Sequence, residues 1–174
     1  DDILQPGRVD GGTDPANSIG TLHDFEPLRF CKALTCPENR VDAAIALTSS
    51  DNLGTSTPPD GYGEPRTGTT SATLGQAVQK YGRTTGLTDG LVSGINATIN
   101  VNYNTGTARF VDQILITDGH FSQGGDSGSL VVTQSSGRND RRPVGLLFAG
   151  SNTHTIANPI DLVLDRFEVK IDGS

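Results

Sequence analysis

Six short apolar runs, separated by turn residues, constrain the fold of this chain more than any other feature of its sequence. The runs are Gln76–Tyr81, Leu91–Tyr103, Arg109–Thr117, Ser129–Gln134, Pro143–Ala149 and Thr155–Ile160. In the second run every other residue from Ile95 to Tyr103 is apolar or aromatic, which is the period of a strand with one buried face. Six short strands in succession predict a small Greek-key barrel. After them, Leu162–Phe167 predicts a short helix that packs on the barrel, with Asp161 as its N-cap.

The first third of the chain shows a weaker strand pattern. Ile19–Phe25 and Val41–Leu47 are strand candidates, and the second is interrupted by the acidic residue Asp42. Residues 51–73 are rich in Ser, Thr, Gly and Pro and contain little that a core would bury, so they predict a linker. We therefore expect two lobes, residues 1–50 and residues 74–174, on either side of this linker.

Composition argues against several classes of function. The net charge is −7 and the only basic cluster is the short run Arg138–Arg142, so a nucleic-acid partner is not expected. No apolar stretch approaches the roughly 18 residues of a membrane span, so no membrane partner is expected. The carboxylates of the N-terminal part, which are Asp10, Asp14, Asp24 and Glu26, lack the spacing of a calcium loop. Neither a metal site nor a cofactor is predicted.

Cys31 and Cys36 are the two cysteines of the chain. In an oxidising compartment they could close a small disulfide loop, which would fit a location outside the cytoplasm. A pair of free thiols in a cytosolic protein is the alternative. Two ligands at this spacing are too few for a structural zinc site.

The loop Gly124–Ser129, with the sequence GGDSGS, carries the strongest chemical signal. A nucleophilic serine needs an exposed hydroxyl and nearby backbone N–H groups that hold the developing oxyanion. The glycines on both sides of Ser127 let the backbone turn sharply, and the N–H groups of Gly125 and Ser127 are the predicted oxyanion donors. Asp126 is expected to point back into the protein and to fix the loop on a buried positive charge.

Two other interpretations of this motif exist. A glycine-rich hairpin with a surface serine would have a similar local sequence. The nucleophile elbow of α/β-hydrolases would not, because it requires glycine two residues after the serine, where this chain has Ser129. The chain also lacks the alternation of strands and helices that such a fold requires.

The segment Gly125–Val131 resembles the nucleophile loop of the chymotrypsin-fold serine peptidases. Three further segments match this family in the right order. They are Val41–Leu47, which resembles the segment around the catalytic aspartate, Tyr81–Gly86, which resembles an early strand and turn of the second barrel, and Pro143–Gly150, which resembles the strand that lines the primary specificity pocket. With Ile3–Gly7 included, the sequence is most similar to the bacterial and Nal1-like trypsin-like members, and the resemblance covers most of the chain.

This resemblance implies an all-β fold of the chymotrypsin type, a Greek-key double barrel with a short C-terminal helix. It assigns Ser127 as the nucleophile and Asp42 as the acid of the catalytic triad. Residues 1–50 would be the remnant of an incomplete first barrel, and residues 74–174 the complete second barrel. The specificity pocket would be formed by His120, Phe121, Ser122, Leu147, Phe148, Ala149 and Gly150.

The catalytic histidine of the family has no match in this chain. In the family it precedes the aspartate in a short motif, and none of His23, His120 and His154 stands in such a motif. His23 also lies too close to Asp42, and His154 is expected at the surface. We therefore expect an upstream segment to carry the base, and this chain alone to be inactive. Without those strands the first barrel would expose its core and an open edge, so the missing segment or a homo-oligomer is the expected partner.

The predicted function is that of a serine endopeptidase with protein or peptide substrates. The predicted pocket floor, Phe121–Gln123, contains no acid, which argues against a preference for Lys or Arg. The wall formed by residues 147–149 favours a neutral apolar or small side chain before the cleaved bond, whereas His120 leaves an acidic preference open. The alternative function is a non-catalytic module that binds a peptide or a partner through the same cleft.

Overall fold

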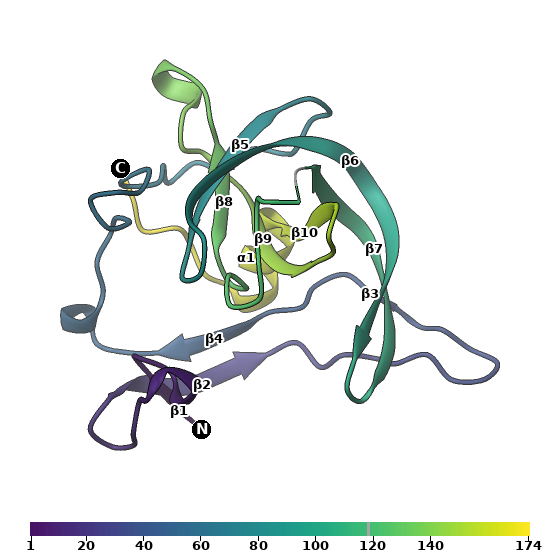
Figure 1. Cartoon of the computed structure of the whole chain (residues 1–174), viewed down its shortest axis with the longest axis horizontal. Helices are drawn as coiled ribbons and strands as arrows, with labels where there is room; N and C mark the ends of the chain where they lie inside the picture. Colours follow the sequence, from purple (N-terminus) through teal and green to yellow (C-terminus); the bar gives the residue numbers. More distant parts are fainter. Residues whose placement is uncertain (118) are drawn as a thin grey trace. The chain divides into compact units, whose positions relative to one another are not determined.

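The computed structural model describes residues 1–117 and 119–174, which divide into two units (Figure 1). The larger unit contains Leu28–Asp42 and Thr55–Ser174, and the smaller one contains Asp1–Pro27 and Ala43–Gly54. Strands dominate the described residues, which contain one α-helix, near the C-terminus, and this confirms the all-β prediction. Within the described residues, no helix has the length and apolar character that crossing a membrane requires.

The larger unit is built on a closed ring of six antiparallel strands (Figure 1). The strands are β5 (Ala77–Gly82), β6 (Gly86–Tyr103), β7 (Gly106–Thr117), β8 (Leu130–Thr133), β9 (Pro143–Gly150) and β10 (His154–Pro159). They follow the order β10-β9-β8-β5-β6-β7, and β10 pairs again with β7, so the sheet closes on itself. Closure removes the open edges that an isolated sheet would expose. The six runs in the sequence therefore do form the strands of one barrel.

Apolar side chains fill the barrel interior. The core cluster comprises Val78, Val92, Ile114, Ile116, Phe121, Val131, Val144, Leu147 and Ala157. In β6 the expected alternation holds from Ala97 to Tyr103 but fails at Ile95, which is 38% exposed. The pairing of β6 with β7 shifts around Gly94 and Ala97, and Asn96 between them has a φ of 51°. This β-bulge turns Ile95 out of the core, and the local pattern gave no sign of it.

Helix α1 (Ile160–Phe167) packs against β9 and β10. It buries Ile160, Val163 and Phe167, which share one helical face. The prediction of Asp161 as the N-cap is wrong, because the cap is Pro159 and Asp161 already lies in the first turn. There its carboxylate still complements the positive end of the helix dipole.

The smaller unit is a three-stranded antiparallel sheet in the order β1-β2-β4. Its strands are β1 (Asp2–Leu4), β2 (Ser18–Phe25) and β4 (Ala44–Leu47), with short 3₁₀ turns at Arg8–Asp10 and Ser50–Asn52. Gly12 is its only buried residue, and apolar side chains such as Phe25 and Leu47 are 52% and 63% exposed. A sheet of this size needs a packed face for stability, so the assignment of residues 1–50 to an incomplete first barrel remains a prediction.

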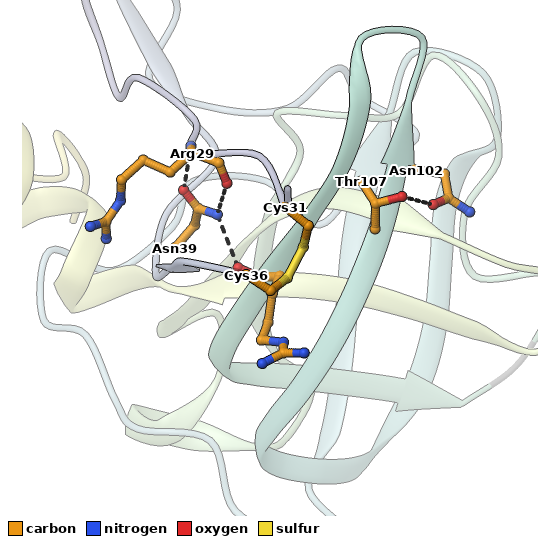
Figure 2. Close-up of a disulfide and its surroundings, with 7 residues drawn as sticks. Arg29, Cys31, Cys36, Asn39, Asn102 and Thr107 are labelled. Carbon is orange, nitrogen blue, oxygen red and sulfur yellow. Dashed lines mark hydrogen bonds between the residues drawn. A yellow bond between two sulfur atoms is a disulfide. The ribbon is translucent and has the colours of Figure 1, made fainter. Parts of the chain in front are cut away.

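The segment Leu28–Asp42, which we call the Asp42 segment, belongs to the larger unit rather than to the first lobe where the sequence placed it. Its short strand β3 (Glu38–Asn39) pairs in parallel with β7, and the Cys31 N–H donates to the carbonyl of Thr107 at 2.8 Å. Cys31 and Cys36 form a disulfide within the segment (Figure 2). The side chain of Asn39 bonds to the N–H and the carbonyl of Arg29 at 2.8 and 2.9 Å and to the carbonyl of Arg109 at 3.0 Å (Figure 2).

The expected linker is also folded onto the larger unit from Thr55 onward. Thr70 donates to the carbonyl of Pro143 at 2.9 Å, and Arg66 donates to that of Arg141 at 2.9 Å. Ser174 donates to the carbonyl of Pro65 at 3.0 Å, which ties the C-terminal residues to the same segment. Backbone bonds, together with the partial burial of Tyr62 and the packing of Ala72 against the core, fix a segment whose composition suggested a free linker.

Replacing Asn39 by Ala should destabilise the attachment of the Asp42 segment. The substitution leaves part-buried backbone groups of Arg29 and Arg109 without their side-chain partner, at a cost of about 1–3 kcal/mol in the free energy of unfolding. The measurement is urea unfolding followed by circular dichroism. Asn102→Ala is the matched control, because it removes an exposed side-chain bond to Thr107 and should cost less than about 1 kcal/mol. Equal losses in the two variants would contradict this account.

Candidate active site

The loop before β8 places Ser127 at the surface through two successive tight turns. Asp126 N–H donates to the carbonyl of Gln123 at 3.1 Å, and Ser129 N–H donates to that of Asp126 at 3.0 Å. Gly125 and Gly128 have φ angles of 101° and 88°, which side chains disfavour. A Cβ atom on Gly125 would also lie 2.4 Å from the hydroxyl of Thr84. The glycines are therefore required by this backbone, and they leave Ser127 exposed.

Asp126 points into the protein, as the sequence predicted, and is 1% exposed. One carboxylate oxygen accepts from the N–H groups of Thr84 and Thr85 at 2.8 and 3.1 Å. The other accepts from the Thr85 hydroxyl at 2.8 Å and from the Gln123 N–H at 2.9 Å. Thr84 and Thr85 lie in the turn between β5 and β6, so Asp126 ties the Ser127 loop to that turn.

The predicted buried positive charge is Lys80 of β5. Its Nζ lies 3.7 Å from the Asp126 carboxylate, and both side chains are fully buried. Nζ also donates to the hydroxyl of Thr85 and to the carbonyl of Gly86, the latter at 3.0 Å. A Cβ atom on Gly82 would lie 2.4 Å from Asp126, so the strand end must be glycine to admit the carboxylate. Lys80, Gly82, Thr84 and Thr85 thus form the site that holds the Asp126 carboxylate.

The hydrogen bonds around Asp126 outweigh its burial. Burial alone would raise the pKa of this carboxyl, but the donors from Gln123, Thr85 and Thr84 hold the pKa below its ordinary value of 3.8. Burial lowers the pKa of Lys80, and Asp126 partly opposes that shift. Asp126 is therefore ionised at neutral pH and fixes the loop as a carboxylate.

The two predicted oxyanion donors are available. Within the described chain, neither the N–H of Gly125 nor that of Ser127 has a protein acceptor. By contrast, the neighbouring N–H groups of Asp126 and Gly128 are both used, the latter by the carbonyl of Leu147 at 2.8 Å. Free N–H groups beside an exposed serine can stabilise negative charge on a substrate carbonyl oxygen.

The hydroxyl of Ser127 has a weak partner. It donates to the carbonyl of Phe148 over 3.5 Å, longer than the usual hydrogen bond of a hydroxyl. In the described part of the chain this hydroxyl therefore meets a backbone carbonyl rather than an imidazole.

A cleft of about 690 Å³ opens beside Ser127. Of the predicted pocket residues, His120, Ser122, Leu147, Ala149 and Gly150 line it, together with Gly119, Gln123, Gly124, Ser151 and Asn152. The hydroxyl of Ser122, one of these lining residues, lies 2.5 Å from that of the buried Thr155. Thr155 was not predicted, because its role depends on β10 lying beside β9.

Phe121 and Phe148 do not line this cleft, although the sequence assigned both to it. Phe121 is fully buried in the barrel core. The ring of Phe148 packs against that of Phe110 at 4.9 Å between centroids. In both places adjacent side chains point to opposite sides of the backbone, so Ser122 and Ala149 face the cleft while their neighbours face the protein.

Asp42 is held by groups that the sequence did not indicate. Its carboxylate accepts from the hydroxyl of Tyr103 at 2.5 Å. The side-chain amide of Asn158 bonds to both its N–H and its carbonyl, at 3.1 and 3.0 Å. Because Asp42 and Ser127 both belong to the larger unit, the barrel that carries the serine also carries the predicted acid.

The three histidines are dispersed. His23 is exposed on β2 of the smaller unit. His120 is exposed at the edge of the cleft. His154 begins β10, half-buried rather than fully at the surface, with its Nδ1 2.9 Å from the hydroxyl of Thr153.

The family model "Nal1 C-terminal domain" matches residues 67–158, which span the barrel, the Ser127 loop and the cleft. The chain belongs to this family. No curated protein sequence matches the chain. The family match and the geometry of the Ser127 loop concern the same residues.

Solved structures of serine proteases resemble this Nal1-type chain. Cellulomonas bogoriensis chymotrypsin is 23% identical with a TM-score of 0.60, over 78% of this chain and 72% of that one. Thermobifida fusca protease A is 23% identical with a TM-score of 0.63, over 78% and 70%. A glutamic-acid-specific serine protease, described as using a histidine triad in substrate binding, is 21% identical with a TM-score of 0.62, over 90% and 75%. At these identities the likeness establishes the chymotrypsin-like fold.

The stability of the domain should fall in acid because of Asp126. Since its folded pKa lies below the unfolded value near 3.8, its contribution is complete above that pH and is lost as the pH falls through the folded pKa. Asp126→Asn leaves Lys80 without its counter-ion, so we expect a loss of about 3–5 kcal/mol at pH 7 that shrinks towards pH 2. The measurement is urea unfolding at a series of pH values.

Asp112→Asn is the control for this experiment. Asp112 pairs with Arg40 at 2.8 Å, but both side chains are well exposed, so its loss should cost less than about 1 kcal/mol at any pH. A difference between wild type and Asp126→Asn that stays constant from pH 7 to pH 2 would show that the Asp126 carboxylate is not the group responsible.

Proposed function

We propose that the protein is a serine endopeptidase in which Ser127 is the nucleophile. The observation that carries this proposal is the fixed geometry of the Ser127 loop. A buried carboxylate holds the loop from behind, while the serine and two unused N–H groups face outward beside a cleft. A surface hairpin with a serine has no need of this arrangement. The chymotrypsin-like fold supports the same role.

The chemistry follows from these groups. Ser127 Oγ attacks the carbonyl carbon of the scissile bond, and its proton passes to an imidazole base. The N–H groups of Gly125 and Ser127 stabilise the oxyanion of the tetrahedral intermediate. The base then returns the proton to the leaving amine, which yields an acyl-enzyme on Ser127. A water molecule, activated by the same base, hydrolyses the ester and restores the hydroxyl.

The base is a histidine outside these 174 residues. Asp42 orients that imidazole, and the larger unit supplies Asp42, Ser127 and the cleft. We place this histidine on an upstream segment of the same precursor. That segment, or a second copy of the chain, would also cover the exposed sheet of the smaller unit. The 174 residues alone therefore turn over little substrate. The competing function, a non-catalytic peptide-binding module, is favoured by the Ser127 hydroxyl, which among the described residues contacts the Phe148 carbonyl and no imidazole.

Labelling with a fluorophosphonate tests the proposal. We expect stoichiometric labelling of Ser127 in the full precursor, little labelling of the 174-residue chain, and partial recovery when imidazole is added to that chain. Mass spectrometry of the labelled peptide locates the adduct. Ser127→Ala should abolish labelling, and Ser136→Ala, which removes an exposed hydroxyl elsewhere on the barrel, should not.

Two results would change the proposal. A precursor that contains a histidine motif and still leaves Ser127 unlabelled would favour the binding module. Strong hydrolysis by the 174-residue chain, abolished by His23→Ala, would place the base on His23 instead.

The cleft predicts cleavage after neutral apolar or small residues. Leu147 and Ala149 line the cleft, as does Ser122, whose hydroxyl contacts that of Thr155, while the described lining contains no carboxylate. Rates for peptides that differ only at the residue before the cut test this specificity. Fastest cleavage after Lys or Arg would refute it. Fastest cleavage after Glu, lost in His120→Ala, would assign the pocket to an acidic side chain, the specificity named for one of the related proteases.

A further inference from the structure

The hydroxyl of Tyr103 is the only side-chain donor on the Asp42 carboxylate among the described residues. Tyr103 ends β6, at the hairpin to β7, and its Oη lies 2.5 Å from Asp42 Oδ2. The bond joins the Asp42 segment to the barrel of Ser127. Asp42 Oδ1 has no donor within the described chain, so this oxygen is open to an outside group.

We propose that Tyr103 is a positioning residue, whose hydroxyl fixes the Asp42 carboxylate in the orientation that the catalytic imidazole requires. This inference rests on the proposed function. Tyr103 donates to Oδ2, and Oδ1 receives the Nδ1–H of the incoming histidine. Tyr103 thus acts through Asp42 and does not touch the substrate.

Hydrogen bonds fix the backbone of Asp42, but they do not fix the torsion angles of its side chain. The side-chain amide of Asn158, which is 0% exposed, accepts from the N–H of Asp42 and donates to its carbonyl. Two residues earlier, the carbonyl of Arg40 accepts from the fully buried Gln113 at 2.9 Å. A half-buried carboxylate on so rigid a backbone can still rotate, and a single strong donor selects one rotamer.

Tyr103 is itself held by aromatic neighbours. Its ring packs edge-on against Phe30 of the Asp42 segment, with centroids 5.9 Å apart and planes at 81°. On its other side lies Phe110 at 6.5 Å, and Phe110 contacts Phe148 at 4.9 Å. Phe148 contributes the carbonyl that accepts from Ser127. A continuous row of contacts therefore runs from Asp42 to Ser127 inside one unit.

The protonation state suits this role. Burial, together with the bond to Asp42 and the negative charge there, raises the pKa of Tyr103 well above its ordinary value of 10. The hydroxyl keeps its proton over the working range of a peptidase and remains a donor. A tyrosine that only filled space would need the ring but not the hydroxyl, and this difference separates the two roles.

The decisive variant is Tyr103→Phe in the full precursor, which keeps the ring and removes the donor. We expect kcat to fall about 10- to 100-fold, as for loss of a hydrogen bond to a charged group, with KM within about twofold of wild type. The control is Tyr81→Phe. Its hydroxyl bonds to the Asp60 carboxylate at 3.0 and 3.1 Å on the same barrel, so it loses the same type of bond without effect on kcat.

A second measurement uses the 174-residue chain and does not depend on activity. In ¹³Cζ-tyrosine-labelled protein, the strong bond should give Tyr103 a slowly exchanging, low-field hydroxyl proton. It should be absent in Tyr103→Phe, lost in Asp42→Ala and retained in Tyr81→Phe. Absence of this proton from the wild-type chain would overturn the inference.

The outcomes separate the two proposals. An active precursor in which Tyr103→Phe leaves kcat unchanged overturns the role of Tyr103 and leaves the peptidase assignment intact. A precursor in which wild-type Ser127 is unreactive overturns the peptidase assignment and the positioning role with it. A fall in kcat shared equally by Tyr81→Phe would mark a general loss of stability and would also overturn the inference.

Discussion

The buried carboxylate of Asp126 determines where Ser127 stands. Five groups converge on it from the turn after β5, from Gln123 and from Lys80. A buried carboxylate needs donors for its lone pairs. This network supplies them in one conformation of the Ser127 loop and therefore excludes other loop conformations. The glycines of the loop only permit such a conformation. The carboxylate selects it, and the exposed serine and free N–H groups follow from the selection.

The barrel gives this network a rigid base. Lys80 belongs to β5, and Thr84 and Thr85 belong to the turn that follows it, while β9 and the loop after it line one side of the cleft. The pairing of β7 with β10 closes these strands into one ring. The same ring holds Asp42 through Asn158 of β10 and Tyr103 of β6, and it holds the neighbouring Arg40 carbonyl through Gln113 of β7. The larger unit is therefore organised around both proposed triad members.

Sequence alone predicted the features that depend on local pattern. The six strand runs, the helix and the inward turn of Asp126 all follow from periodicity or from an acid set between glycines. Features that depend on residues distant in the sequence were not predicted. In the sequence, Lys80 is one of several scattered charges, and only the position of β5 beside the Ser127 loop shows its partner. Tyr103 is one of several alternating residues in its strand, and the sequence does not show its bond to Asp42. The displacement of Ile95 depends on the β-bulge in β6, and the inward rings of Phe121 and Phe148 depend on the side of the backbone to which each residue points. Composition encodes neither. The Asp42 segment was assigned to the wrong lobe because its attachment is made by β3, Asn39 and the Thr107 carbonyl rather than by an apolar pattern.

The free-energy cost of desolvating these buried polar side chains suggests why the larger unit contains them. A buried ion pair such as Lys80 and Asp126 contributes little net stability compared with apolar residues of the same size, because two charges must be desolvated. Asn158, Gln113 and Asn39 likewise occupy core positions that apolar side chains would fill at lower cost. Stability therefore does not account for them. The Lys80–Asp126 pair instead fixes the backbone that carries Ser127. The three buried amides fix the backbone of the Asp42 segment. Polar burial is concentrated where the orientation of these two side chains is decided, and this distribution is the one expected of a site built for chemistry.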